Sequence, residues 1–136
     1  MNNEKDNVYD LVEDFYAHDE GWNTLLRQEY AEGFLRMEAW KGKKNSDLYR
    51  SWDNLTMLCL YLGSAETFLG DMNADDFIDC IAWCGRNISE FTPDYKNTQD
   101  FLETCDGLFK YLKGKNAISN DTVPGLSLIH ISEPTR

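Results

Sequence analysis

Four cysteines are the residues of this chain whose type and spacing come closest to a metal site. Cys80 and Cys84 are four positions apart, so a helix would place both thiols on one face, and Cys59 and Cys105 fall in neighbouring predicted helices. Four thiolates at such positions could hold zinc in tetrahedral geometry. All four residues, however, lie in or beside apolar helical stripes, where a free cysteine packs as a small hydrophobe. We therefore expect core thiols and no metal ligand.

The segment 71–75 has the oxygen-bearing side chains that open a calcium-binding loop of the EF-hand type. Asp71, Asn73 and Asp75 occupy its first, third and fifth positions. The sixth position is Asp76 where a sharp turn needs glycine, and the twelfth is Ala82 where a bidentate glutamate completes the coordination. Helix capping by Asn73 explains the same residues, so calcium is not expected.

Other short patterns fall short of a catalytic or cofactor site. His18-Asp19 resembles a ligand pair of metal-dependent phosphohydrolases, but such sites need further histidines and the rest of the chain up to residue 125 has none. The Gly-Lys-Lys at 42–44 lacks the preceding glycine and strand of a phosphate loop, and Gly63-Ser64-Ala65 lacks the frame of a hydrolase elbow. The aromatic stripes could line a ligand pocket, although core packing is the commoner role. The sequence predicts a non-enzymatic protein without catalytic residues, cofactor or metal.

The elements that would position these residues are all helical, because apolar residues recur at i, i+3, i+4 and i+7 and no segment alternates as a strand does. We predict an all-α fold, an irregular bundle of about five helices. The first two predicted helices cover residues 5–18 and 22–40. The third is predicted to be capped by Ser46 or Asp47 and to run to 69, the fourth to cover 73–84, and the fifth to end at 114.

Helix ends and buried faces follow from the same pattern. Gly70 and Gly85 are predicted to stop the third and fourth helices, and Thr92 to cap the fifth, with Pro93 at its first position and Asp94 in its first turn. The predicted inward faces include large side chains of every helix, among them Leu11, Phe15, Trp40, Phe68, Ile78 and Tyr95.

The end of the chain differs in character from the rest. Residues 126–136, LSLIHISEPTR, resemble the in-frame translation of a transposase sequencing adapter. We therefore expect a single helical domain over residues 1–125, either a stand-alone protein or the N-terminal part of a longer one, followed by a non-native tail.

The charge of the chain limits its partners. The net charge is −11, and it stays at −11 without the tail, which holds one Glu and one Arg. Such an excess repels nucleic acid and anionic membrane, and favours a basic protein. The N-terminus has no secretory pattern and no apolar run approaches a membrane span, so a cytoplasmic location is expected. The acids cluster on two predicted helices, at Asp75, Asp76 and Asp79 and at Asp100, Glu103 and Asp106.

The order of elements from 46 to 125 resembles the helical core-binding domain of tyrosine recombinases and phage integrases, and also other bacterial helical proteins. The resemblance rests on the aromatic-Leu pair Phe68-Leu69, the short helix from Asn73 to Trp83, the Leu-Phe-Lys-Tyr-Leu at 108–112, and the Ile-x-Asn at 118–120. It implies DNA binding, with catalytic residues in a following domain.

This stretch departs from the family in charge, because it holds six basic residues against thirteen acids. If it binds DNA, the lysines should converge on one face: Lys43, Lys44, Lys110, Lys113 and Lys115. The sequence therefore favours a non-enzymatic, acidic protein-interaction module of a bacterial or phage protein. The alternative is the DNA-binding N-terminal domain of a truncated recombinase.

Overall fold

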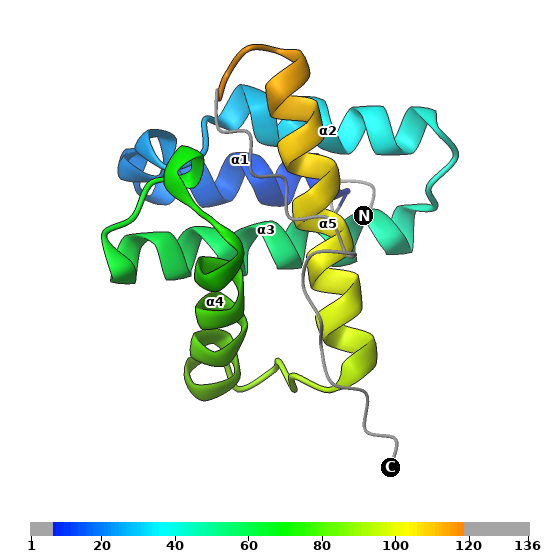
Figure 1. Cartoon of the computed structure of the whole chain (residues 1–136). Coiled ribbons are helices and arrows are strands. Elements are labelled where there is room, and N and C mark those ends of the chain that lie inside the picture. Colours follow the sequence, from blue (N-terminus) through cyan, green and yellow to red (C-terminus); the bar gives the residue numbers. More distant parts are fainter. Residues whose placement is uncertain (1–6, 119–136) are drawn as a thin grey trace. The chain divides into compact units, whose positions relative to one another are not determined.

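The computed structural model describes residues 7–118, and every regular element in this range is helical (Figure 1). The five α-helices confirm the predicted all-α bundle of about five helices. No helix in the described range is long and apolar enough to cross a membrane. The adapter-like segment 126–136 and the end of the Ile-x-Asn segment lie outside the described residues. The helices are α1 (Val8–His18), α2 (Gln28–Trp40), α3 (Asn45–Ala65), α4 (Ala74–Asn87) and α5 (Tyr95–Gly114), with short 3-10 helices η2 (Glu20–Thr24) and η3 (Leu69–Asp71).

The chain divides into two compact units, Met1–Cys59 and Leu60–Arg136. The first holds α1, η2, α2 and the start of α3. The second holds the end of α3, η3, α4 and α5. The single-domain interpretation of residues 1–125 stays a prediction.

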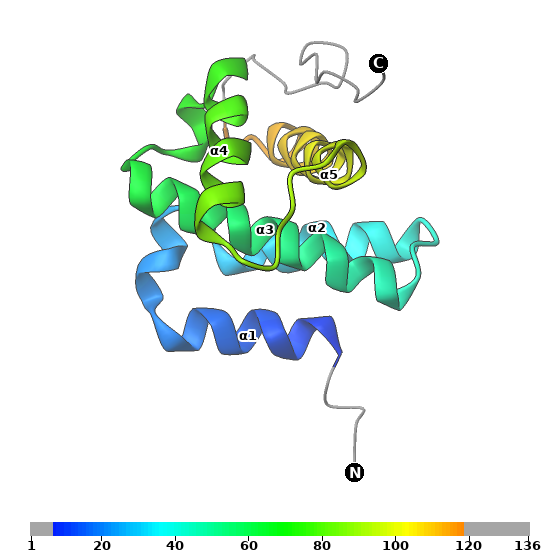
Figure 2. The ribbon, with the colours of Figure 1, turned by 90° about the horizontal axis from the view of Figure 1, so that it is seen from below.

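In the first unit, α1 runs antiparallel to α2 and packs along it (Figure 2). Asn7 caps α1 by accepting a hydrogen bond from the amide of Asp10 at 3.1 Å. The buried face of the helix is Val8, Val12 and Tyr16, four residues apart. The predicted inward position of Leu11 is wrong, because the side chain is 41% exposed just beyond the edge of that face.

The second helix begins later than predicted. Residues 20–24 form η2, and α2 starts only at Gln28, whose amide donates to Asn23 Oδ1 at 2.8 Å. In the segment between η2 and α2, the carbonyl of Leu26 accepts a hydrogen bond from the Tyr16 hydroxyl. That carbonyl is bound by a side chain of α1, so the hydrogen bond anchors the segment between η2 and α2 to the core.

At the turn between α2 and α3 two predictions are wrong: the burial of Trp40 and the cap of α3. Trp40 is the last residue of α2 and is 88% exposed, because the chain turns away there with Gly42 at φ 106°. Neither Ser46 nor Asp47 caps α3. The Lys44 carbonyl accepts from the amides of Asp47 and Leu48, both at 3.0 Å, so the helix starts at Asn45.

Helix α3 ends four residues before the predicted position. Glu66 adopts a left-handed φ of 56°, and the amide of Thr67 reaches back to the Leu62 carbonyl at 3.2 Å. This closure satisfies a carbonyl of the last turn without glycine, so Gly70 is not the stop. The following residues leave the helix, and Phe68 is 59% exposed instead of buried, whereas Leu69 is buried.

In the second unit, α4 begins as predicted. Asn73 Oδ1 accepts from the amide of Asp76 at 3.0 Å, and Asp76 Oδ2 accepts from the amide of Asn73 at 2.9 Å. Phe77 is fully buried and meets Phe109 of α5 edge to face, with ring centroids 5.4 Å apart. The prediction that Ile78 is buried is wrong, because it follows Phe77 onto the outer face and is 46% exposed.

The connection from α4 to α5 also differs from the prediction. Gly85 does not stop α4, which continues to Asn87; a Cβ at Gly85 would lie 2.9 Å from Pro93 Cγ, so its role is to let the loop approach. Asp94, not Thr92, caps α5, since its Oδ1 accepts from the amide of Asn97 at 2.8 Å. Helix α5 ends at Gly114 as predicted, and Tyr95 at its start is 37% exposed rather than buried.

Candidate functional site

The four cysteines are free and buried. The Cys80 thiol donates a hydrogen bond to Cys84, which raises the pKa of Cys80 and lowers that of Cys84. Burial alone raises the pKa of Cys59 to about 12. In the described range no group of three or more His, Cys, Asp or Glu side chains is arranged to hold a metal ion. Among the four cysteines, the sequence therefore predicts correctly that Cys80 and Cys84 lie on one face of α4.

The other sequence candidates have local structural roles. Asn73 and Asp76 form the capping box of α4, so these side-chain oxygen atoms of the calcium-like segment accept hydrogen bonds from backbone amides. Asp19 Oδ1 accepts from the amide of Gly21 at 2.8 Å and thereby caps η2. Its neighbour His18 is exposed at the end of α1.

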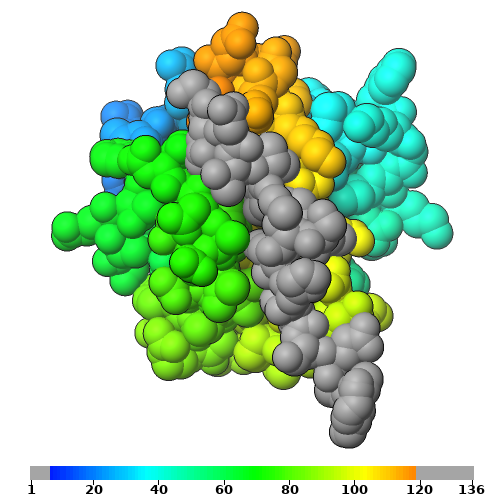
Figure 3. Space-filling model, in the orientation of Figure 1, coloured from blue at the N-terminus to red at the C-terminus, as the bar shows by residue number. Residues whose placement is uncertain are grey.

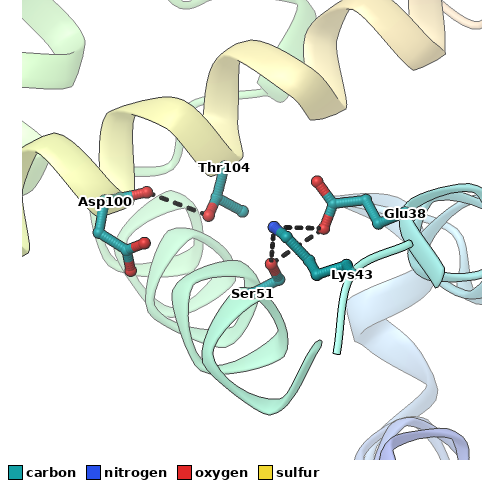
Figure 4. A network of polar contacts seen from close by, with 5 residues as sticks. All are labelled: Glu38, Lys43, Ser51, Asp100 and Thr104. Atoms are coloured by element: carbon teal, nitrogen blue, oxygen red, sulfur yellow. Dashed lines mark hydrogen bonds and ion pairs between the residues drawn. The ribbon is translucent and has the colours of Figure 1, made fainter. Parts of the chain in front are cut away.

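A buried serine takes part in a polar network that the sequence did not predict (Figure 4). Lys43 Nζ donates to Glu38 Oε1 at 3.0 Å and to Ser51 Oγ at 3.1 Å, and Ser51 Oγ donates to the same Glu38 oxygen at 3.0 Å. In this arrangement the ammonium is a donor to the serine and does not accept its proton. The network joins the turn after α2 to both flanking helices. Figure 4 also shows Thr104 Oγ1 donating to the Asp100 carbonyl at 3.1 Å within α5.

The first unit contains a cleft of about 480 Å³ with aromatic and acidic walls. Its volume lies in the range typical of small-molecule sites. The α1 residues recur at i, i+3, i+4 and i+7, so they form one face of that helix. The lining side chains come from α1, η2 and α3: Leu11, Asp14, Phe15, His18, Trp22, Trp52 and Asp53.

Three aromatic rings set the shape of this aromatic–acidic cleft. Phe15 stacks on Trp22 with centroids 4.8 Å apart and an interplanar angle of 19°. Trp52 meets Phe15 at 86° and 5.3 Å. The stacked pair and Trp52 therefore form two walls that meet close to a right angle. Trp52 is 4% exposed, whereas Phe15 and Trp22 are half-buried and accessible from the cleft.

Each wall carries a carboxylate beside it. Asp14 precedes Phe15 in α1, Asp53 follows Trp52 in α3, and both are exposed at the rim. Partial burial raises the pKa of the Asp53 carboxyl above its ordinary value. The sequence suggested that aromatic stripes could line a pocket, but it singled out neither acid. The missed signal was the pair of acid–aromatic neighbours, Asp14-Phe15 and Trp52-Asp53.

The second unit has a different acidic surface on the outer side of α4. Asp75, Ile78, Asp79 and Ala82 are all exposed and recur at helical spacing along one face. Within residues 7–118, no Lys or Arg forms an ion pair with Asp75 or Asp79. Burial raises the pKa of the nearby Tyr61 phenol, and Cys80, Asp79 and Asp76 raise it further. The two exposed carboxylates make the α4 surface locally electronegative. The segment that contains α4 is green in the space-filling view (Figure 3).

Of the other charged residues that the sequence analysis names, some are exposed and others interact with a neighbouring side chain. On α5, Glu103 is exposed, whereas Asp106 Oδ2 is 2.9 Å from Lys110 Nζ. Lys43 is likewise paired with Glu38, and Lys115 lies over the Tyr111 ring at 5.6 Å.

Comparison with known proteins finds no match: no protein-family model, no curated protein and no solved structure matches this chain.

Proposed function

We propose that this chain is a non-enzymatic protein-interaction module whose α4 surface binds a basic partner protein. The observation that carries this proposal is the exposed apolar side chain of Ile78, which is flanked on one helical face by Asp75 and Asp79. An apolar centre with a charged rim is the usual anatomy of a protein interface. A single exposed isoleucine would carry no argument. Ile78 is notable because it lies between two carboxylates that form no ion pair with a described Lys or Arg.

The partner chemistry follows from the charge of this surface. Lysine and arginine side chains would pair with Asp75 and Asp79, and an apolar side chain between them would cover Ile78. Complementary charge of this kind raises the association rate and fixes orientation more than it adds affinity. The charges are exposed, so salt screens them over about 8 Å at physiological ionic strength. Binding should therefore weaken as salt is raised.

The experiment is affinity capture from a bacterial lysate at low and physiological salt. The bait is the full chain, the double variant Asp75→Asn with Asp79→Asn, or a control double variant, Glu90→Gln with Glu103→Gln. The control changes the same net charge and removes two exposed acids of the same unit. We expect the wild type and control to enrich the same partner and the α4 variant to lose it.

Two results would contradict the proposal. One is capture of nothing above background at either salt concentration. The other is equal loss in both double variants, which would indicate attraction by net charge rather than by the α4 surface.

The alternative function, DNA binding by a recombinase-like arm, has weaker support. It needs free lysines, yet Lys43 pairs with Glu38 and Lys110 pairs with Asp106. Each phosphate contact that is lost weakens binding and its salt dependence. A gel-shift titration at low salt tests it, and a shifted band at micromolar protein would favour this alternative over the α4 proposal.

A further inference from the structure

The aromatic–acidic cleft of the first unit has no role in the proposal above. We propose that this cleft binds a small organic cation that carries a quaternary or methylated ammonium group. The inference rests on three features of the cleft: two aromatic walls at nearly a right angle, a carboxylate beside each wall, and a volume of about 480 Å³.

The aromatic walls favour a cation over a neutral apolar ligand. The face of an aromatic ring is electronegative, and a cation within about 6 Å of the ring centroid is attracted to it. Trp22 and Trp52 carry the indole ring, which makes the strongest such contacts. Because Phe15 covers one face of Trp22, the ligand would contact the half-buried Trp22 on its other face, with Trp52, which is 4% exposed, closing the cleft beside it.

The charges of the cleft exclude an anion. Two of its lining residues are acids, and none of the described residues that line it is Lys or Arg. The surrounding segment is acidic too: residues 7–26 contain five Asp or Glu and no Lys or Arg. Within residues 7–118, the other titratable group that lines the cleft is His18, at the end of α1.

The same walls select a methylated ammonium over a bare one. A primary ammonium needs hydrogen-bond acceptors for its three protons; the rings supply none, so only the carboxylates of Asp14 and Asp53 at the rim could accept them. A methylated ammonium spreads its charge over apolar methyl groups, which lose little by leaving water and pack against rings. Asp14 and Asp53 at the rim would then supply long-range attraction without direct hydrogen bonds.

The test is a calorimetric titration of the full chain with choline chloride and with 3,3-dimethylbutan-1-ol, which has the same shape without the charge. We expect choline to bind at least about tenfold more tightly than the alcohol. Quenching or enhancement of tryptophan fluorescence should follow the same titration curve, because two tryptophans line the cleft.

Matched variants locate the site. Asp14→Asn with Asp53→Asn should weaken choline binding several-fold, whereas Asp10→Asn with Asp47→Asn should leave it unchanged. Each pair takes one acid from α1 and one from α3 and changes the net charge equally. Trp22→Leu should abolish the preference for choline over the alcohol, and its circular dichroism spectrum and unfolding curve would establish that it is folded.

Three results would overturn the inference: equal affinity for choline and the neutral alcohol, no detectable heat or fluorescence change with choline, or equal weakening by both acid pairs. None of these bears on the α4 proposal, whose variants lie in the other unit.

Discussion

Substitution of Tyr16 by phenylalanine tests the anchoring of the connection between α1 and α2. The Tyr16 side chain is 2% exposed and its hydroxyl donates to the Leu26 carbonyl, which belongs to a residue equally buried. Phenylalanine keeps the ring and removes only the hydroxyl. The carbonyl then loses its side-chain donor in a buried setting, and such a loss costs about 1–3 kcal/mol. We expect the free energy of unfolding at pH 7 to fall by that amount.

The same substitution has a predictable pH dependence. Burial, with smaller contributions from Cys59 and Glu32, raises the pKa of the Tyr16 phenol in the folded protein. The unfolded phenol titrates near its ordinary value of about 10. The stability that Tyr16 contributes is therefore complete below pH 10 and is lost above it, by about 1.4 kcal/mol at pH 11. Phenylalanine does not titrate, so the difference between wild type and variant should narrow by about this amount between pH 9 and 11.

Urea unfolding followed by far-ultraviolet circular dichroism, at pH 7, 9 and 11, measures both effects. Tyr95→Phe is the control, because the Tyr95 side chain is exposed at the start of α5, and it should change stability little at any pH. The burial of Cys59 raises its pKa as well, so some alkaline loss should remain in every variant. A Tyr16→Phe protein as stable as wild type at pH 7, with an unchanged difference at pH 11, would refute the reasoning.

Three further predictions test helix ends and the core. Gly85→Ala should destabilise the protein by about 1–3 kcal/mol, because the new Cβ would lie 2.9 Å from Pro93 Cγ, whereas Gly114→Ala, whose Cβ meets nothing within 4 Å, should be neutral or stabilising in the same unfolding assay. Asn73→Ala should cost about 0.5–2 kcal/mol through loss of the α4 cap and Asn73→Ser much less; equal costs would contradict the capping-box reading. All four buried thiols should react slowly with a thiol reagent such as Ellman's reagent in buffer and rapidly in denaturant; four fast thiols in the native protein would show that the cysteines are not core residues.

The features that could be predicted from sequence depend on local rules. Helix existence follows from apolar spacing, and the Asn73 cap follows from a residue type that satisfies amides within its own first turn. Some errors arise where a distant segment decides, and others where the chain adopts a conformation that its local sequence does not favour. Gly85 has the signature of a helix stop, but its role is set by the approach of Pro93. Glu66 closes α3 in a left-handed conformation that no local preference favours, and this moves Phe68 to the surface.

The aromatic–acidic cleft shows the same limit for a binding site. Its α1 wall consists of Leu11, Asp14, Phe15 and His18, and two of these residues, Leu11 and Phe15, belong to the apolar repeat that predicts the inward face of the helix. Only the packing of η2 and α3 beside α1 brings Trp22 and Trp52 to Phe15. A single sequence does not specify which edge of an apolar helical face will be covered by a neighbouring element and which edge will line a cleft.

The measurement that tests the central claim most directly is the dissociation constant of the captured partner for the full chain, determined by calorimetry at low and physiological salt. Exposed charge pairs contribute about 0.2–1 kcal/mol each, so Asp75→Asn with Asp79→Asn should weaken binding about two- to thirtyfold, and added salt should reduce the difference. The Glu90→Gln and Glu103→Gln control should bind as the wild type does. Equal affinity of the wild type and the α4 variant at low salt would contradict the proposed role of the α4 surface.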